Sequence, residues 1–149
     1  MKLDQLKGEI VGAAVSGGLD SCTLTRWLVD QGVDVVCFTA DLGQPDEKDM
    51  NEVRQRMLAS GAKEAILVSA ASDLAEAGLQ VIQSQATYEG GYWNTTGIAR
   101  HITVAVLLLE MKKRGIRILA HGATGRGNDQ VRFQLATNML NPDMEVYAP

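Results

Sequence analysis

The stretch 15–22 reads Val-Ser-Gly-Gly-Leu-Asp-Ser-Cys and carries residue types suited to holding an anion. An apolar run at 10–15 predicts a buried strand before it, and apolar residues at helical spacing follow it. In a strand–loop–helix unit, the free N–H groups and the dipole of the first helical turn favour negative charge. Paired glycines let the backbone approach a phosphate, and Ser16 and Ser21 add hydroxyl groups. We therefore interpret the stretch as a phosphate-binding loop, against the alternative of a plain glycine turn.

Asp20 is the unexpected member of this loop, because a carboxylate repels a phosphate. We interpret it as either a helix-capping residue or a residue that organises magnesium. The common P-loop pattern Gly-x-x-x-x-Gly-Lys-Ser/Thr is absent, and so is the dinucleotide pattern Gly-x-Gly-x-x-Gly. The pattern Ser-Gly-Gly-x-Asp-Ser instead resembles the PP-loop of ATP pyrophosphatases. Members of that superfamily cut ATP between its α and β phosphates and hold the pyrophosphate in this loop.

The rest of the chain must position this loop, and its pattern predicts strands that alternate with helices. Strands are predicted at 10–15, 33–40, 64–68, 116–121 and 145–148, and helices at 24–31, 46–60, 72–84, 98–114 and, as a short element, after 129. Asp46 is the expected cap of the second helix, with Val53, Met57 and Leu58 facing inward. The polar and aromatic segment 86–97 has little periodicity and is predicted to be a functional loop.

Such alternation is typical of an α/β fold, here a doubly wound, parallel five-stranded sheet with helices on both faces. Ligands of these sheets bind at the carboxyl ends of strands, near the point where the strand order reverses. The stretches 15–22, 40–43 and 122–129 each follow a predicted strand. The sequence therefore predicts that all three line one crevice.

Bulk properties narrow the classes of protein. A length of 149 residues predicts one domain, and a formal net charge of −4 argues against non-specific nucleic-acid binding. Two cysteines, Cys22 and Cys37, favour a reduced protein over a disulfide scaffold. We find neither a signal-peptide pattern nor an apolar run of the ~18 residues that a membrane span needs. We therefore expect a cytoplasmic protein without nucleic-acid or membrane partners.

Three segments together resemble argininosuccinate synthase, in their order as well as their spacing. They are 14–20, 39–44 and His121-Gly-Ala-Thr-Gly-Arg-Gly-Asn-Asp-Gln-Val-Arg-Phe133, and the last is highly specific. The resemblance covers nearly the whole chain, as the PP-loop nucleotide-binding domain 1–149, but only the amino-terminal domain of that enzyme. It implies ATP and magnesium as cofactors, and small-molecule partners: ATP, aspartate and citrulline. It further implies a homo-oligomer or a carboxy-terminal domain that this sequence does not include.

The resemblance also implies site residues by position. The ATP-binding residues would be Ala14, Val15, Ser16, Gly17, Gly18, Leu19, Asp20, Ser21, Cys22, Ala40 and Gly122. Aspartate would be bound by Thr124, Asn128 and Asp129, and citrulline by Tyr92, Gly97, Asn128 and Arg132. No residue would act as a covalent nucleophile, because catalysis in this family is positioning and charge stabilisation at the α-phosphate.

Several alternatives remain open at this point. Arg132 could form a surface salt bridge, Tyr92 and Trp93 could pack a loop, and His121 is expected to be a strand-end residue without a catalytic task. Cys22 replaces a hydroxyl that is usual in the family's loop. Other readings of the whole chain are another PP-loop ATP-dependent synthetase, of the amidotransferase or tRNA-thiolating type, and a non-catalytic nucleotide-binding module.

Overall fold

The computed structural model describes residues 2–44, 49–123 and 127–149. In chain order its elements are η1 (Leu3–Gln5), β1 (Ile10–Ala14), α1 (Leu19–Asp30), β2 (Asp34–Asp41), α2 (Met50–Ala59), β3 (Glu64–Ser69), α3 (Ala71–Gln83), β4 (Thr87–Tyr88), β5 (Tyr92–Trp93), α4 (Thr95–Lys113), β6 (Ile118–His121), α5 (Asn128–Leu140) and β7 (Glu145–Tyr147).

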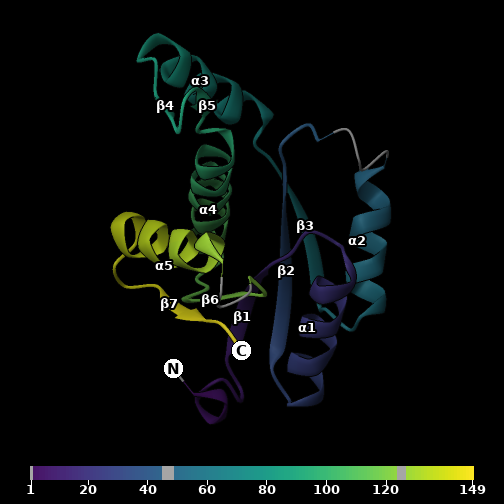
Figure 1. The fold of residues 1–149 in the computed structure, drawn as a ribbon. Coiled ribbons are helices and arrows are strands. Elements are labelled where there is room, and N and C mark those ends of the chain that lie inside the picture. Colours follow the sequence, from purple (N-terminus) through teal and green to yellow (C-terminus); the bar gives the residue numbers. More distant parts are fainter. Residues whose placement is uncertain (1, 45–48, 124–126) are drawn as a thin grey trace.

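Five strands form one parallel sheet in the order β3-β2-β1-β6-β7, which confirms the predicted doubly wound topology (Figure 1). The chain builds outward from β1 through β2 to β3, then crosses back and places β6 on the other side of β1. The order therefore reverses between β1 and β6. Ala14 is in register with Phe38 of β2 and with His121 of β6, so the three strands reach the same edge of the sheet.

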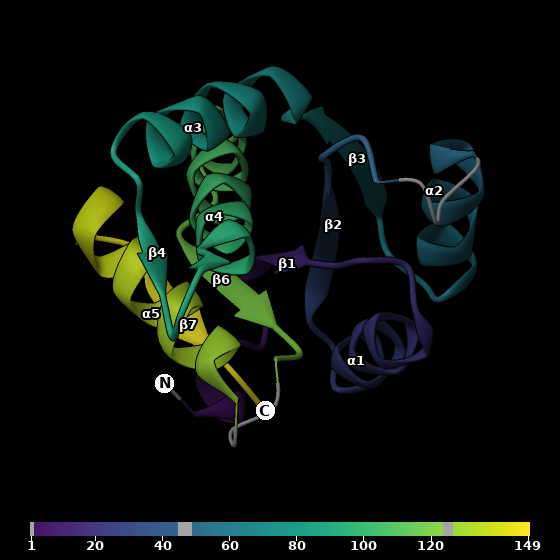
Figure 2. The ribbon, with the colours of Figure 1, turned by 45° about the horizontal axis from the view of Figure 1, so that its top comes forward.

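Helices cover both faces of the sheet, as predicted, and each face has its own apolar core (Figures 1 and 2). On one face, Leu24 and Leu28 of α1 and Met57 of α2 are buried against the strands. On the other, Leu107 of α4 and Phe133 of α5 belong to the second core. Strands buried on both faces explain the continuous apolar runs that identified them in the sequence.

The helix ends are mostly where the sequence places them. Gly32, Gly61 and Gly115 follow α1, α2 and α4 with positive φ angles, a conformation that commonly ends a helix. The expected cap Asp46 lies outside the described residues. Asp49 caps α2 instead, where its side chain accepts a hydrogen bond from the Asn51 N–H at 2.8 Å.

Several expectations are corrected. Leu58 is 40% exposed rather than inward, because it lies next to Met57, whose side chain takes the sheet-facing position on the helix. The segment 86–97 is a hairpin, with β4 and β5 antiparallel, followed by the first turn of α4. A two-residue strand is too short for periodicity to indicate it. The last helix, α5, has 13 residues and is not short.

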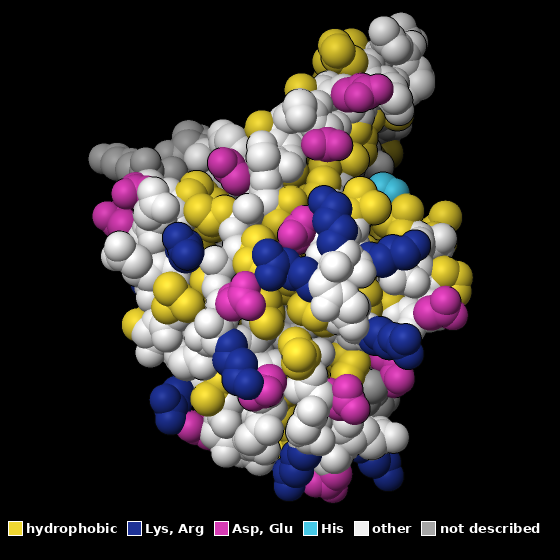
Figure 3. All heavy atoms as spheres, turned by 180° about the vertical axis from the view of Figure 1, so that it is seen from behind, with side chains coloured by type: hydrophobic (Ala, Val, Ile, Leu, Met, Phe, Trp, Pro, Cys, Tyr) yellow, Lys and Arg dark blue, Asp and Glu magenta, His cyan; other side chains and the backbone are white. Residues whose placement is uncertain are grey.

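The segment from α3 to the hairpin projects beyond the sheet. α3 packs on α4, and Figure 3 shows hydrophobic side chains along the projection, while charges of both signs are mixed over the rest of that face. Leu79 and Ile82 of α3 are each 59% exposed. No helix in the described part of the chain is long and apolar enough to cross a membrane.

Candidate nucleotide and amino-acid site

The loop between β1 and α1 is closed by its two serines. The backbone N–H of Ser16 donates to Oγ of Ser21 at 3.0 Å, and the two hydroxyl oxygens are 3.3 Å apart. Gly18 occupies the N-cap of α1 without a side-chain cap, so the N–H groups of the first turn remain free for an anion. Gly17 has φ of +81°, and a Cβ there would lie 2.6 Å from Cγ1 of buried Val53. Only glycine fits this position without strain.

Asp20 lies in the first turn of α1, and its side chain makes no capping hydrogen bond. The helix-capping interpretation of Asp20 is therefore wrong. Asp20 instead is one of the residues that line a cavity beside the loop. The second interpretation, a residue that organises magnesium, remains a prediction.

A cavity of about 260 Å³ lies at the carboxyl edge of the sheet, where the strand order reverses. The described parts of all three predicted stretches contribute to it, which agrees with the single crevice expected from the sequence. Predicted site residues that line it are Ala14, Val15, Ser16, Asp20, Ser21, Ala40, Gly122 and Asp129. Leu42 and Ala123, from the predicted stretches 40–43 and 122–129, line it too. Lining residues outside the three predicted stretches include Thr39, Gln44, Arg100, Thr103, Leu107 and Phe133.

Other predicted site residues lie away from the lining of this cavity. They are Gly17, Gly18, Leu19, Cys22, Tyr92, Gly97, Asn128 and Arg132, whereas Thr124 lies outside the described residues. Gly17 shapes the loop from behind, packed against α2. Gly97 lies in the first turn of α4 and Asn128 begins α5. The ligand roles assigned to these residues remain predictions.

Asp129 forms the centre of an ion-pair cluster beside the cavity. Its Oδ2 accepts from Nε of Arg100 at 2.9 Å, and its Oδ1 accepts from a terminal amino group of Arg132 at 3.0 Å. Partial burial tends to raise the pKa of Asp129, but the hydrogen bonds and charges of the two arginines outweigh burial and hold this pKa below its usual value. Asp129 is therefore ionised at neutral pH, and the cluster carries a net charge of +1.

Tyr92, on the hairpin, lies close enough to this cluster to feel the charge of Arg132. Its hydroxyl lies 3.2 Å from Oγ1 of Thr96, and this hydrogen bond is the main cause that lowers the pKa of Tyr92. The positive charge of Arg132 acts in the same direction. The structure thus brings Tyr92 and Arg132, two residues predicted for citrulline, into each other's electrostatic range.

His121 has a more definite environment than a plain strand end. It is 2% exposed, stacks on Phe133 with ring centroids 4.8 Å apart, and its Nδ1 accepts the Ala123 N–H at 3.2 Å. Burial lowers the pKa of His121, so the ring is neutral at pH 7. These contacts hold the turn that leads into the second glycine-rich loop. His121 also lines the cavity, and the expectation that it has no catalytic task stays a prediction.

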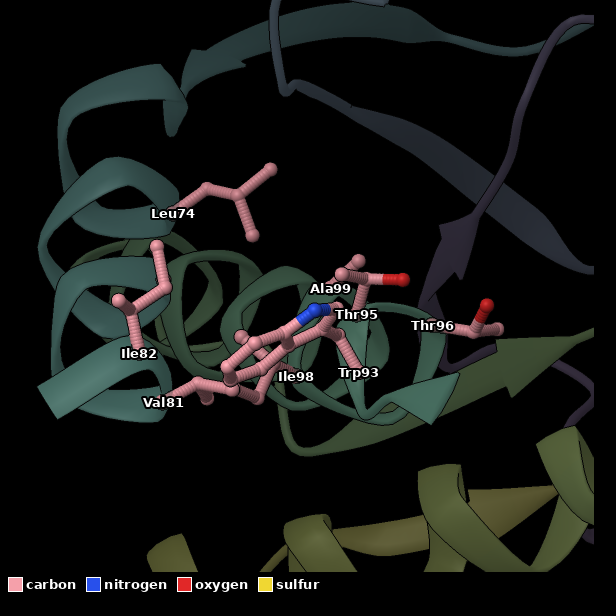
Figure 4. A pocket seen from close by; sticks show the side chains of 9 residues that line it. Leu74, Val81, Ile82, Trp93, Thr95, Thr96, Ile98 and Ala99 are labelled. Atoms are coloured by element: carbon pink, nitrogen blue, oxygen red, sulfur yellow. The ribbon is translucent and has the colours of Figure 1, made fainter. Parts of the chain in front are cut away.

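An apolar groove lies next to the cavity, between α3, the hairpin and the start of α4. It has a volume of about 680 Å³ and is lined by residues such as Leu74, Val81, Trp93 and Ile98. Figure 4 shows the Trp93 indole lying across the groove between the aliphatic side chains of α3 and those of α4. The groove and the cavity are neighbours because Thr96 and Ala99 line the first and Arg100 lines the second.

Magnesium is implied by the resemblance, and the donor set can be tested against it. The described residues contain no group of three or more His, Cys, Asp or Glu that could hold a metal by itself. Magnesium often binds through one or two carboxylates plus substrate phosphates and water. Asp20 at the cavity suits that mode, in which the nucleotide brings most of the ligands.

The parallel sheet with a serine- and glycine-rich loop at its reversal point defines a Rossmann-like α/β domain of the HUP class. Solved structures of similar fold include NAD+ synthetase from Burkholderia pseudomallei, with a TM-score of 0.51 and 16% identity over 93% of this chain and 69% of that one. Pantothenate synthetase from Thermus thermophilus has a TM-score of 0.54 and 14% identity, over 99% of this chain and 58% of that one. A universal stress protein in complex with cAMP has a TM-score of 0.51 and 13% identity, over 94% of both chains.

Residues 10–149 match the family model of the arginosuccinate synthase N-terminal HUP domain, and the chain belongs to this family. Argininosuccinate synthase from Aquifex aeolicus is 40% identical over 145 residues. That match covers 97% of this chain and 36% of the relative, so the chain spans about a third of the relative's length.

Proposed function

We propose that this chain binds ATP with magnesium, with the triphosphate on residues 14–22 and the adenosine near Ala40 and Gly122. The observation that carries the proposal is the loop of Ser16 to Ser21 at the reversal point of the sheet, where Ser16, Asp20 and Ser21 line the cavity and the first turn of α1 has no side-chain cap. Membership of the argininosuccinate synthase family supports the same ligand.

The reaction that we infer for the complete site is the ligation of citrulline and aspartate. The ureido oxygen of citrulline attacks the α-phosphorus of ATP, the bond to the β-phosphate oxygen breaks, and pyrophosphate leaves. The aspartate amine then attacks the ureido carbon, AMP leaves, and the amine loses a proton. No protein nucleophile is required, so the residues of this chain act by orienting the reactants and by stabilising charge.

The cluster around Asp129 supports the amino-acid part of the proposal. An ionised carboxylate can accept hydrogen bonds from an ammonium group, and an arginine can hold a carboxylate through a bidentate fork. Asp129 and Arg132 supply these two groups, 3.0 Å apart. We assign aspartate to Thr124, Asn128 and Asp129, and citrulline to Tyr92, Gly97, Asn128 and Arg132.

We further infer that the chain alone has little or no ligase turnover. It spans 36% of a relative that carries the family name, and the amino-acid side of its site is exposed at Tyr92 and Asn128. Misalignment of reactants forfeits a large effect, because alignment contributes about 7–11 kcal/mol in well-oriented reactions. A nucleotide-binding module without turnover is therefore the second candidate function.

Calorimetry with ATP and magnesium, and with a slowly hydrolysed ATP analogue, tests the nucleotide proposal. Heat of binding and a raised unfolding temperature are expected. Ser16→Ala should weaken binding by about 1.5–3 kcal/mol, because the hydroxyl bonds to a charged group. The absence of both a binding heat and a thermal shift at millimolar ATP would refute the proposal.

A pyrophosphate-release assay with ATP, citrulline and aspartate separates the two candidate functions. ATP binding without pyrophosphate release would support the module. Turnover near the ~10 per second of ordinary enzymes would show that the chain has a complete catalytic site.

A further inference from the structure

The cavity presents an electrostatic problem for a triphosphate. The only charged residue in the loop 15–22 is Asp20, and the second carboxylate that lines the cavity is Asp129. Backbone N–H groups and a helix dipole supply partial charges only. A cation from the protein, in addition to magnesium, would therefore favour ATP in this cavity.

Arg100 is the one Lys or Arg among the described residues that line this cavity. It comes from the second turn of α4, on the face of the sheet opposite α1, so the cavity lies between its guanidinium and the loop serines. Its side chain is 41% exposed, and a ligand can reach it.

The guanidinium is oriented but not fully used. Asp129 accepts from Nε of Arg100 at 2.9 Å, and no second hydrogen bond of this guanidinium occurs within the part of the chain that the structure describes. Arginine has five N–H donors, so four remain on the terminal amino groups. A planar fork with free terminal donors suits a phosphate in bidentate geometry.

Asp129 in turn is held by Arg132 at 3.0 Å, so the guanidinium of Arg100 is fixed against a carboxylate that is itself anchored. Fixing Arg100 in advance reduces the side-chain entropy that ligand binding must otherwise remove. Because the cluster retains a net charge of +1, it attracts an anion despite the carboxylate at its centre.

We propose that Arg100 binds a phosphate of the nucleotide and is a protein cation that neutralises part of the triphosphate charge in this cavity. The inference rests on the proposed ATP function. It assigns to Arg100 a direct ligand contact, and to Asp129 a second task, that of holding Arg100 by its Nε edge.

The experiment is calorimetry of the full chain with magnesium-ATP, AMP and adenosine, for the unaltered protein, Arg100→Gln and Arg100→Lys. Arg100→Gln should weaken ATP about 10- to 150-fold, as expected for one hydrogen bond to a charged group. The affinity for adenosine, which has no phosphate, should differ by less than twofold between the unaltered protein and Arg100→Gln. Arg100→Lys keeps the charge but loses the fork, so its ATP affinity should lie between the other two.

Arg117→Gln is the matched control, since it removes the same charge from an exposed residue that does not line the cavity. Its ATP affinity should stay within twofold of the unaltered chain. The logarithmic salt dependence of ATP binding should become less steep in Arg100→Gln but not in Arg117→Gln.

The outcomes are distinguishable. Failure of the unaltered chain to bind ATP would overturn the proposed function and this inference with it. ATP binding that is equal in Arg100→Gln and the unaltered chain would overturn the role of Arg100 alone. A parallel loss of ATP and adenosine in both Arg100 variants would show that Arg100 only supports the fold of the site.

Discussion

Gly17→Ala should destabilise the protein and damage the phosphate loop, whereas Gly18→Ala, one residue away, should be nearly neutral. Gly17 has φ of +81°, and its added Cβ would lie 2.6 Å from Cγ1 of Val53. Gly18 has φ of −75°, and the nearest atom to its added Cβ is 3.7 Å away. The two substitutions add the same methyl group in different backbone and packing environments.

The magnitude follows from two costs. The left-handed conformation costs a residue with a Cβ roughly 1–2 kcal/mol, and overpacking a filled core costs about 1–3 kcal/mol. Gly17→Ala should therefore lose about 2–5 kcal/mol, which for a domain of this size lowers the unfolding temperature by roughly 4–20 °C. Gly18→Ala should lose less than about 1 kcal/mol, since glycine is only modestly better than alanine at an N-cap.

Denaturant unfolding of Gly17→Ala, Val53→Ala and the double variant tests the packing part. Val53→Ala removes the atom that the new methyl meets, so the double variant should be about 1–3 kcal/mol more stable than additivity predicts. Calorimetry with ATP should show weaker binding in Gly17→Ala than in Gly18→Ala. Equal unfolding temperatures for Gly17→Ala and Gly18→Ala, or strict additivity with Val53→Ala, would refute the reasoning.

Three further outcomes are expected. Burial raises the pKa of the Cys37 thiol to about 11, so a thiol reagent should label half-buried Cys22 first and reach Cys37 only on unfolding. ATP should slow the labelling of Cys22, and early labelling of Cys37 would contradict its burial. Burial lowers the pKa of His121, so the histidine of the unfolded chain takes up a proton first as the pH drops, and the stability of the fold should fall as pH drops through about 6.5. His121→Asn should reduce this pH dependence in thermal melts at pH 5 to 8. Identical pH profiles of the two proteins would exclude a contribution of His121. Ile82→Lys should reduce the fluorescence of an apolar dye bound in the apolar groove between α3, the hairpin and α4. Leu109→Lys, at an exposed residue outside this groove, should not reduce it. Equal dye fluorescence in both variants would mean that the groove is not the dye site.

The sheet could be predicted from the sequence because each strand is an apolar run that ends in a turn. Residues 11–13 and 35–40 of the first two runs are buried, and strands covered on both faces are apolar along most of their length. The doubly wound arrangement of the strands could also be predicted, because right-handed crossovers restrict how alternating strands and helices are wound. The hairpin at 87–93 could not be predicted, because each of its antiparallel strands has two residues, too few to show a periodic pattern.

The site divides in the same way. Residues 14–22 and 122–129 form contiguous patterns, so they could be identified from the sequence. Those of them that line the cavity lie near the ends of strands. Arg100 was missed because it lies within the 19-residue helix α4, where a single arginine outside any motif resembles an ordinary helix residue. Its contact with Asp129 joins residues 29 positions apart, and only the packing of α4 against α5 brings them together.

The packing around the cavity differs between its two sides, so the proposed nucleotide binding and the proposed ligase chemistry should be separable. The phosphate side of the proposed site is preorganised: Gly17 is packed against α2, Ser16 is bonded to Ser21, and Arg100 in the second turn of α4 is held by Asp129. The amino-acid side is built from the exposed hairpin and the starts of α4 and α5, beside an apolar groove of about 680 Å³. A site with one preorganised half binds the ligand of that half at low entropic cost, whereas a reaction between two ligands needs both halves to be aligned. ATP affinity should therefore survive changes to the hairpin, such as Tyr92→Phe, that reduce any synthetic turnover.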